Sequence, residues 1–324
     1  MSNQGEGRTK RLTPVAIADA HVDVLWRMDE ERHPFYGDSP LMASYQKMQE
    51  AHVRTQVFAL FTSPRRSSGT QLEQVLRCLD RFYHDVVRPG SVRMVVDAKG
   101  LSTAHQQGEV AAVLSLEGAG CLHGQVSILR VLHRLGVRGV GLTWNDANEF
   151  ADGCLEDRNA GLTRSGRDLV RELARLGMWL DLAHLGDGST ADALRCSDGP
   201  VMASHANARQ VHPHPRNLPD AVIREIVQRD GWIGLTFEGS FVSEREHLSM
   251  DAVLEHVDYM LNLGAEDHLG FGSDFDGTSH PIPGLADMGD YPALARKLRE
   301  RYGEALTRKL MAENLERFLL QVLS

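Results

Sequence analysis

The chain has 324 residues, of which 42% are hydrophobic and 24% are charged, and its formal net charge is −9 at pH 7. This length fits two ordinary domains or one large α/β barrel, and the near-average composition provides enough apolar residues for a large core. The acidic balance argues against a nucleic-acid-binding surface, and no apolar run approaches the roughly 20 residues of a membrane span.

The first segment is a polar leader, predicted over residues 1–12, which begins MSNQGEGRTKR and lacks the apolar region of a secretory signal. The rest of the chain, 13–324, contains no linker or repeat that would divide it, so one domain is expected. Its cysteines are far apart and show no CxxC spacing, which is typical of reduced thiols in a cytoplasmic protein. They are Cys78, Cys121, Cys154 and Cys196.

Eight short apolar runs follow one another along this domain, and each has the length of a buried parallel strand. They lie at 15–20, 53–61, 111–116, 137–143, 178–183, 200–204, 231–237 and 268–273. Helical stretches are expected at 72–87, 126–135, 163–176, 219–229 and 250–263, with two more at about 292–302 and 304–323. Residues 24–51 are interpreted as a loop that leads into a helix from about Leu41, 92–96 as a minor strand, and 146–161 as a long polar connection. Alternating strands and helices predict a single (β/α)8 TIM barrel.

Polar or aromatic side chains stand where the apolar runs end, and in a barrel such residues converge on one face. They are His21, Asp23, Glu117, Trp144, His184, His205 and Asp274. His21 and Asp23 point the same way because side chains alternate along a strand. Each residue taken singly could also be a hydrogen-bonded core or strand-end group.

Taken together, the three histidines with Asp23 and Glu117 supply three imidazoles and two carboxylates. That number exceeds the needs of one tetrahedral zinc ion and suits two metal ions that share a bridging carboxylate. The basic pair Arg65 and Arg66 is interpreted as a solvated surface cluster. Asp276 is interpreted as a carboxylate that caps a loop.

The longer segments around these residues resemble the renal (membrane) dipeptidase family, peptidase family M19, which belongs to the amidohydrolase-type metal barrels. The similar segments are DAHVD, SLEG, GVRGVGLTWNDANEFADG, LARLGMWLDLAHL, GPVMASHANAR, HPRNLPD and HLGFGSDFDG. The resemblance implies that His21 and Asp23 bind one zinc ion and that His184 and His205 bind a second. It also implies that Glu117 bridges the two ions together with a water or hydroxide.

The resemblance further implies a dipeptide substrate, including dipeptides with a D-residue at the C-terminal position, and a possible homodimer. Asp274 would transfer the proton, a general acid–base task, and the planar guanidinium of Arg216 would anchor the substrate carboxylate. Trp144 and Asn145 are expected to bind substrate. Trp144 stands where renal-type members have a histidine, and an indole N–H can donate a hydrogen bond but cannot become charged. Two alternatives therefore stay open: a hydrolase of another small amide in a biosynthetic pathway, or a metal-binding homologue with reduced catalysis.

Overall fold

The computed structural model describes residues 14–66, 68–245 and 247–324, so the leader predicted over 1–12 lies outside the described residues. Within these ranges nine strands form one parallel sheet, in the order β2-β1-β9-β8-β7-β6-β5-β4-β3. An additional pairing of β2 with β4 closes eight of them into a barrel. The strands are β1 Ile17–Val22, β2 Val53–Phe61, β3 Val92–Met94, β4 Val110–Glu117, β5 Val137–Gly141, β6 Trp179–Asp181, β7 Val201–Ala203, β8 Trp232–Leu235 and β9 Leu269–Phe271. The predicted (β/α)8 fold is confirmed, and the minor strand β3 pairs with the first residues of β4.

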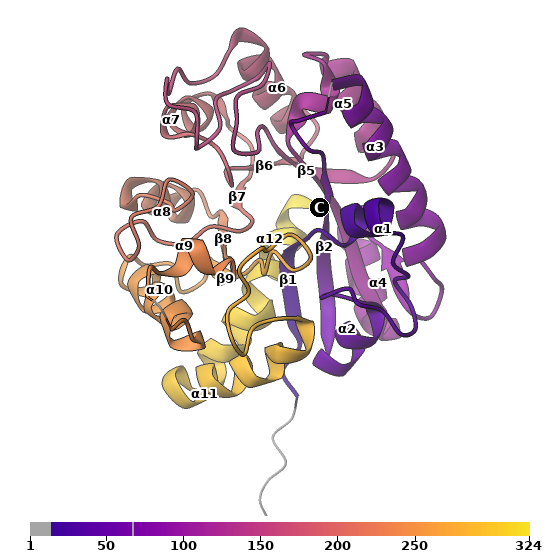
Figure 1. Ribbon diagram of the computed structural model, residues 1–324, viewed down its shortest axis with the longest axis vertical. Coiled ribbons are helices and arrows are strands. Elements are labelled where there is room, and N and C mark those ends of the chain that lie inside the picture. Colours follow the sequence, from indigo (N-terminus) through magenta and orange to yellow (C-terminus); the bar gives the residue numbers. More distant parts are fainter. Residues whose placement is uncertain (1–13, 67, 246) are drawn as a thin grey trace, which may run out of the picture.

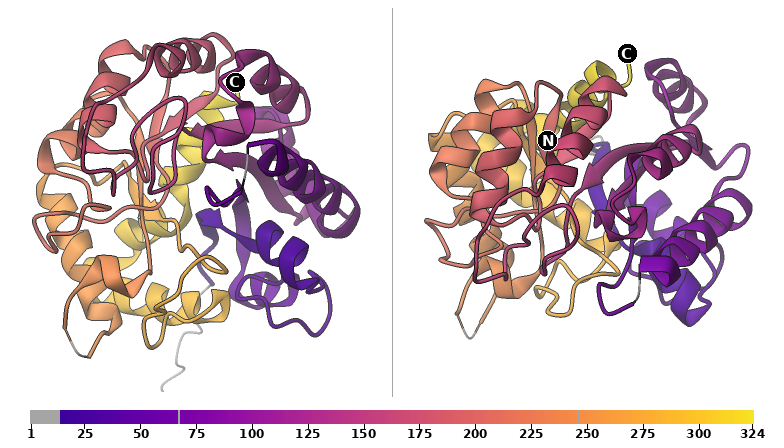
Figure 2. Two further views of the ribbon diagram at one scale, coloured as in Figure 1. Left: turned by 45° about the horizontal axis from the view of Figure 1, so that its top comes forward. Right: turned by 90° about the horizontal axis from the view of Figure 1, so that it is seen from above.

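Helices lie around the outside of this sheet (Figures 1 and 2). They are α1 Val24–Glu31, α2 Tyr45–Ala51, α3 Ser68–Arg81, α4 Ala98–Gln107, α5 Val126–Arg134, α6 Arg164–Arg175, α7 Asp187–Cys196, α8 Asp220–Gln228, α9 Gly239–Val242, α10 Met250–Asn262, α11 Tyr291–Arg308 and α12 Asn314–Val322. Among the described residues, no helix is both long enough and apolar enough to cross a bilayer. All four cysteines are free thiols.

Two local predictions were wrong. The stretch after Asp23 is not a loop, because α1 begins at Val24 and ends where Arg32 takes a left-handed conformation with φ 58°. The next helix, α2, begins at Tyr45 and not near Leu41. The last two predicted helices do divide as expected, because Gly303, with φ 79° and ψ 173°, interrupts the helical backbone within α11, and helical structure then continues to the end of α12 at Val322.

Glycines on the strands make room for two large side chains in the barrel. A Cβ atom at Gly139 of β5 would lie 1.9 Å from the ring of Trp179, and one at Gly270 of β9 would lie 2.6 Å from the ring of Trp232. Both tryptophans are completely buried, and the Trp179 ring also contacts Phe318 of α12 at a centroid distance of 6.4 Å. These packed rings fill the barrel interior, so chemistry is confined to the end where the strands finish.

Candidate metal centre

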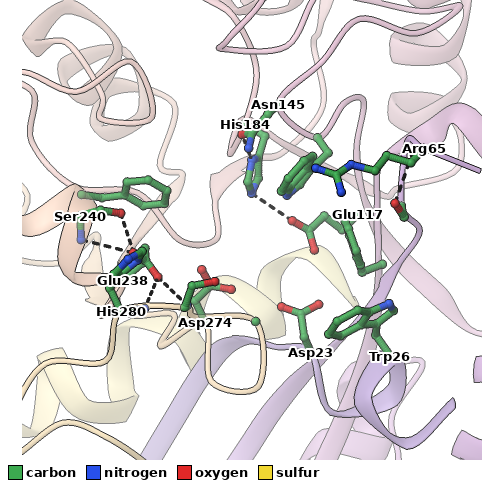
Figure 3. Close-up of a pocket in the computed structure, with 16 residues that line it drawn as sticks. Asp23, Trp26, Arg65, Glu117, Asn145, His184, Glu238, Ser240, Asp274 and His280 are labelled. Carbon is green, nitrogen blue, oxygen red and sulfur yellow. Dashed lines mark hydrogen bonds and ion pairs between the residues drawn. The ribbon is translucent and has the colours of Figure 1, made fainter. Parts of the chain in front are cut away.

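The side chains predicted as metal ligands lie together at the carboxyl ends of the barrel strands, although they come from distant parts of the chain. His21 lies near the end of β1, and Asp23 is the first residue after this strand. Glu117 is the last residue of β4, His184 follows β6, and His205 follows β7. Asp274 follows β9, and Figure 3 shows its carboxylate facing the same space as Asp23 and Glu117.

Glu117 lies at the centre of this group. Its Oε2 is 3.3 Å from His21 Nε2, while its Oε1 is 3.0 Å from His184 Nε2 and 3.7 Å from His205 Nε2. The two oxygens therefore face different histidines, which is the arrangement that a carboxylate shared by two metal ions requires.

The other carboxylates lie on the His21 side of the centre. His21 Nε2 is 3.4 Å from Asp23 Oδ2 and 3.9 Å from Asp274 Oδ1. Two overlapping sets have ligand atoms within 4.8 Å of one another, namely His21–Glu117–His205 and His21–Asp23–Asp274. His21 Nε2 and Asp23 Oδ1 are buried and have no hydrogen-bond partner in the described chain. Buried polar atoms without partners are costly, so this donor set fits divalent cations.

Electrostatics favour the neutral form that metal binding needs in two of the three histidines. Burial, followed by the charge of Arg216, lowers the pKa of His184 to about 3. Burial and the charge of His21 hold the pKa of His205 well below its usual range, so both rings are neutral and can act as ligands. Burial lowers the pKa of His21, but the negative charges of Glu117 and Asp23 outweigh it and raise the pKa overall.

Two polar side chains orient the neutral imidazoles. Asn145 Oδ1 lies 2.8 Å from His184 Nδ1, and Ser204 Oγ lies 2.7 Å from His205 Nδ1. Because an amide oxygen only accepts, His184 carries its proton on Nδ1 and turns the Nε2 lone pair toward Glu117. Outer contacts of this kind fix the tautomer and direction of metal-binding histidines.

Two of the converging residues have backbones that non-glycine residues rarely adopt. His184 has φ 64° and Asp274 has φ 67°. A left-handed residue costs roughly 1–2 kcal/mol, and such strain is found mainly at functional sites. Each left-handed residue turns the chain where it leaves the strand, and nothing in the sequence predicts this conformation.

A cavity of about 560 Å³ opens onto these residues. One wall is aromatic: the Phe61 ring lies 5.9 Å from Trp26 and 5.8 Å from Trp144, and Trp144 lies 5.9 Å from His184. The opposite wall is polar, and Figure 3 shows Glu238, Ser240 and His280 there. A second cavity of about 500 Å³ is lined by Trp144 as well, so the indole belongs to the walls of both.

The chain matches the family described as membrane dipeptidase (peptidase family M19) over residues 8–323. This chain is a member of peptidase family M19. An uncharacterized dipeptidase of Schizosaccharomyces pombe is 33% identical over 274 residues, which are 79% of this chain and 66% of that protein. Dipeptidase aclJ of Aspergillus oryzae is 33% identical over 240 residues, which are 73% of this chain and 56% of that protein. The chain thus spans less than two thirds of the length of these two relatives.

A crystal structure of another metallopeptidase has a closely similar fold. The crystal structure of a metallopeptidase from Rhodobacter sphaeroides, liganded with a phosphinate mimic of the dipeptide L-Ala-D-Ala, is 28% identical. The match covers 96% of this chain and 100% of that one, with a TM-score of 0.89. The resemblance inferred from short motifs is therefore confirmed at the level of the family and the fold.

The predicted substrate anchor of this M19 chain, Arg216, lies deeper than its place in a loop suggests. It is 3% exposed and sits behind His184 and Phe241, which line the cavity. Its Nη2 donates to the His205 carbonyl at 2.9 Å and lies 3.1 Å from His184 Nε2. Its Nε is buried without a partner in the described chain, so the guanidinium retains capacity to bind an anion.

Residue-level reasoning missed other members of the site. Arg65 is exposed, as interpreted, but its side chain also lines the cavity. Asp19 and Asp181 were not singled out, although a carboxylate inside each of two apolar runs was a usable signal because burying it is costly. Asp276 does hold a loop, since it accepts hydrogen bonds from the backbone N–H groups of Met42 and Ala43.

Proposed function

We propose that this chain is a two-zinc dipeptidase, which hydrolyses the peptide bond of dipeptides, including those with a D-residue at the C-terminal position. The observation that carries the proposal is the convergence of three imidazoles on the two oxygens of Glu117, with Asp23 beside them. Membership of the M19 family supports the activity, and the dipeptide mimic bound to the Rhodobacter protein supports the substrate class.

Two zinc ions held by His21, Asp23, Glu117, His184 and His205 would lower the pKa of a water molecule and polarise the scissile carbonyl. The residues around the ions would transfer protons and bind the substrate. Asp274 lines the cavity, and burial together with the negative charges of Asp23 and Glu117 raises its pKa well above the ordinary value despite the opposing charge of His21. A carboxyl group with a raised pKa can both accept a proton and return it to the leaving amine.

Recognition of the substrate would use the cavity walls together with Arg216, which contacts the lining residues His184 and Phe241 from behind. Arg216 offers a planar fork that matches a carboxylate, which selects short peptides with a free C-terminus. Trp144 and Asn145 both line the cavity, although the Asn145 oxygen is also engaged by His184. The cytoplasmic location, the homodimer and the leader stay predictions.

Trp144 gives a specific reason to retain a second candidate, a hydrolase of another small amide or a homologue with reduced catalysis. A histidine in that place could supply charge to a developing oxyanion, whereas the indole can only donate one neutral hydrogen bond. Losing a donor aimed at an oxyanion costs on the order of 10²–10³ in rate.

Metal analysis of the purified protein, combined with a panel of L,L- and L,D-dipeptides, tests the proposal. Two zinc equivalents and turnover of panel members are expected. Replacing Asp274 by Asn should lower kcat about 10²–10⁴-fold with the zinc content retained, because the proton transfer is lost and the predicted ligands are not. Two bound ions without turnover of any dipeptide would favour the other amide, and an unchanged rate for Asp274→Asn would refute its role.

A further inference from the structure

Two buried aspartates make matching backbone contacts at two places on the barrel mouth, one between β1 and β9 and one between β6 and β7, and Asp19 Oδ2 also accepts from the Tyr291 hydroxyl at 2.6 Å. Asp19 Oδ1 accepts hydrogen bonds from the backbone N–H of His21 at 2.8 Å and of Ser273 at 3.2 Å. Asp181 Oδ1 accepts from the backbone N–H of Ala183 at 3.0 Å and of Ser204 at 3.0 Å. In each case one donor is two residues further along the chain, and the other is a serine just after the end of the neighbouring strand.

Each of the two serines directly precedes a residue of the metal centre, so these contacts bear on the position of that residue. Ser273 is followed by Asp274, and Ser204 is followed by His205. Asp19 therefore joins the end of β1, which carries His21, to the end of β9. Asp181 likewise joins the end of β6 to the end of β7.

Backbone pairing alone is weak at both places. β1 pairs with β9 at Asp19–Phe271 and with the following segment only at the isolated bridge Val22–Phe275, and the register of β6 with β7 ends at Asp181–Met202. Next to these few pairs each carboxylate accepts two backbone N–H groups, one on each of the two segments that it joins. Asp19 is 0% and Asp181 5% exposed, so removing either leaves buried donors unsatisfied, at about 1–3 kcal/mol each.

We propose that Asp19 and Asp181, the strand-end aspartates, are positioning residues that each serve one half of the metal centre. Asp19 fixes the β1–β9 half, which consists of His21, Asp23 and Asp274. Asp181 fixes the β6–β7 half, which consists of His184 and His205. The proposal rests on the two-zinc function above and adds that the halves are held independently, with Glu117 of β4 between them.

Zinc titrations of the full chain against a competing chelator, which give two stepwise dissociation constants, test this division. The variants His21→Ala and His205→Ala identify which constant belongs to which half. We expect Asp181→Ala to raise the constant of the β6–β7 half about 10–100-fold, as outer-sphere losses do, and to leave the other nearly unchanged. Asp19→Ala should show the reverse. Glu117→Ala, which removes a group common to both halves, should raise both constants.

The matched variants Asp19→Asn and Asp181→Asn distinguish a positioning role of the carboxylate oxygens from a requirement for the aspartate in folding. An amide oxygen can accept the same two hydrogen bonds, so these variants should recover most of the lost affinity. If an alanine variant does not fold, the Asn variant should still show a smaller change confined to the same half, because a neutral oxygen is a weaker acceptor.

Equal changes in both constants, or no change in either, would overturn the proposal. So would an alanine variant that does not fold paired with an Asn variant of wild-type affinity, since the aspartate would then serve only folding. Wild-type protein that takes up fewer than two zinc ions would instead refute the two-zinc function. The two failures are therefore distinguishable.

Discussion

Arg65 lines the metal cavity together with four carboxylates, those of Asp23, Glu117, Glu238 and Asp274. It extends inward from the loop between β2 and α3, on the side of Trp26 (Figure 3). A guanidinium within an acidic cavity attracts anionic groups and offsets the repulsion that they would otherwise meet. We therefore expect Arg65→Glu to lower kcat/KM for dipeptides with an acidic side chain about tenfold relative to neutral ones, which corresponds to about 1.4 kcal/mol.

The neighbouring Arg66 provides the matched control for this prediction. It pairs with Glu30 and lines the second cavity, so Arg66→Gln should leave the charge preference unchanged. The measurement is a comparison of kcat/KM for acidic, neutral and basic dipeptides at low and high salt. An Arg65→Glu variant with the wild-type order of substrates would show that this side chain does not select charge.

At the level of single residues, the sequence predicted well which side chains stand at the strand ends. It predicted poorly which other side chains surround them. Strand-end periodicity placed His21, Glu117 and His205 correctly at the mouth, because a strand defines where its last side chain points. It could not place Arg65, whose position depends on the path of a loop. The burial of Arg216 likewise depends on packing between Phe241 and His184, which are far apart in the sequence.

His256 shows how an element away from the metal centre supports the site. It lies on α10, where Nδ1 accepts the backbone N–H of Ala208 at 3.1 Å and Nε2 donates to the Val242 carbonyl at 2.9 Å. The helix is thereby joined to the loop that leads to Arg216 and to α9. Periodicity predicted α10, but no local pattern connects its histidine to residues 14 and 48 positions away.

The buried state of His256 predicts a pH dependence of stability. Burial lowers its pKa from 6.5 to about 4, so the unfolded chain binds this proton more readily than the folded one. Stability is then fully present above pH 6.5 and is lost as the pH falls toward 4, by up to about 3 kcal/mol. Urea unfolding between pH 7.5 and 4.5 should show a shallower loss in His256→Gln than in the wild type. Parallel pH profiles for the two proteins would contradict this assignment.

The short strands explain which elements could be predicted. Apolar runs of five to nine residues predicted all eight barrel strands, but β6, β7 and β9 are only three residues long, since the chain leaves the sheet early to form the site. The left-handed turns at His184 and Asp274 occur at these exits. Helix α1 was missed because it has only eight residues and begins directly after Asp23, where Pro34 and Gly37 favoured a loop.

Across the whole molecule, the metal centre joins parts of the barrel that are remote in sequence. Its predicted ligands lie at or just after the ends of β1, β4, β6 and β7, and without cations three carboxylates lie close together in a buried site. Metal ions that bind only the folded state stabilise it by mass action, by about 4 kcal/mol at a thousandfold excess over Kd. Chelation should therefore lower Tm by roughly 8–16 °C, given about 2–4 °C per kcal/mol for domains of 150–250 residues.

Calorimetry of the protein before and after exhaustive dialysis against a chelator measures this shift, and re-addition of zinc should reverse it. His205→Ala, which lacks one ligand of the β6–β7 half, should show a smaller shift because one ion is held less tightly. The proposed role of the strand-end aspartates leads to a further expectation. The Tm of Asp181→Ala should also change less with zinc, whereas the Tm of Asp181→Asn should change nearly as much as that of the wild type. If chelation leaves Tm unchanged in a protein that has demonstrably lost zinc, the barrel mouth is held by its own hydrogen bonds and not by the ions.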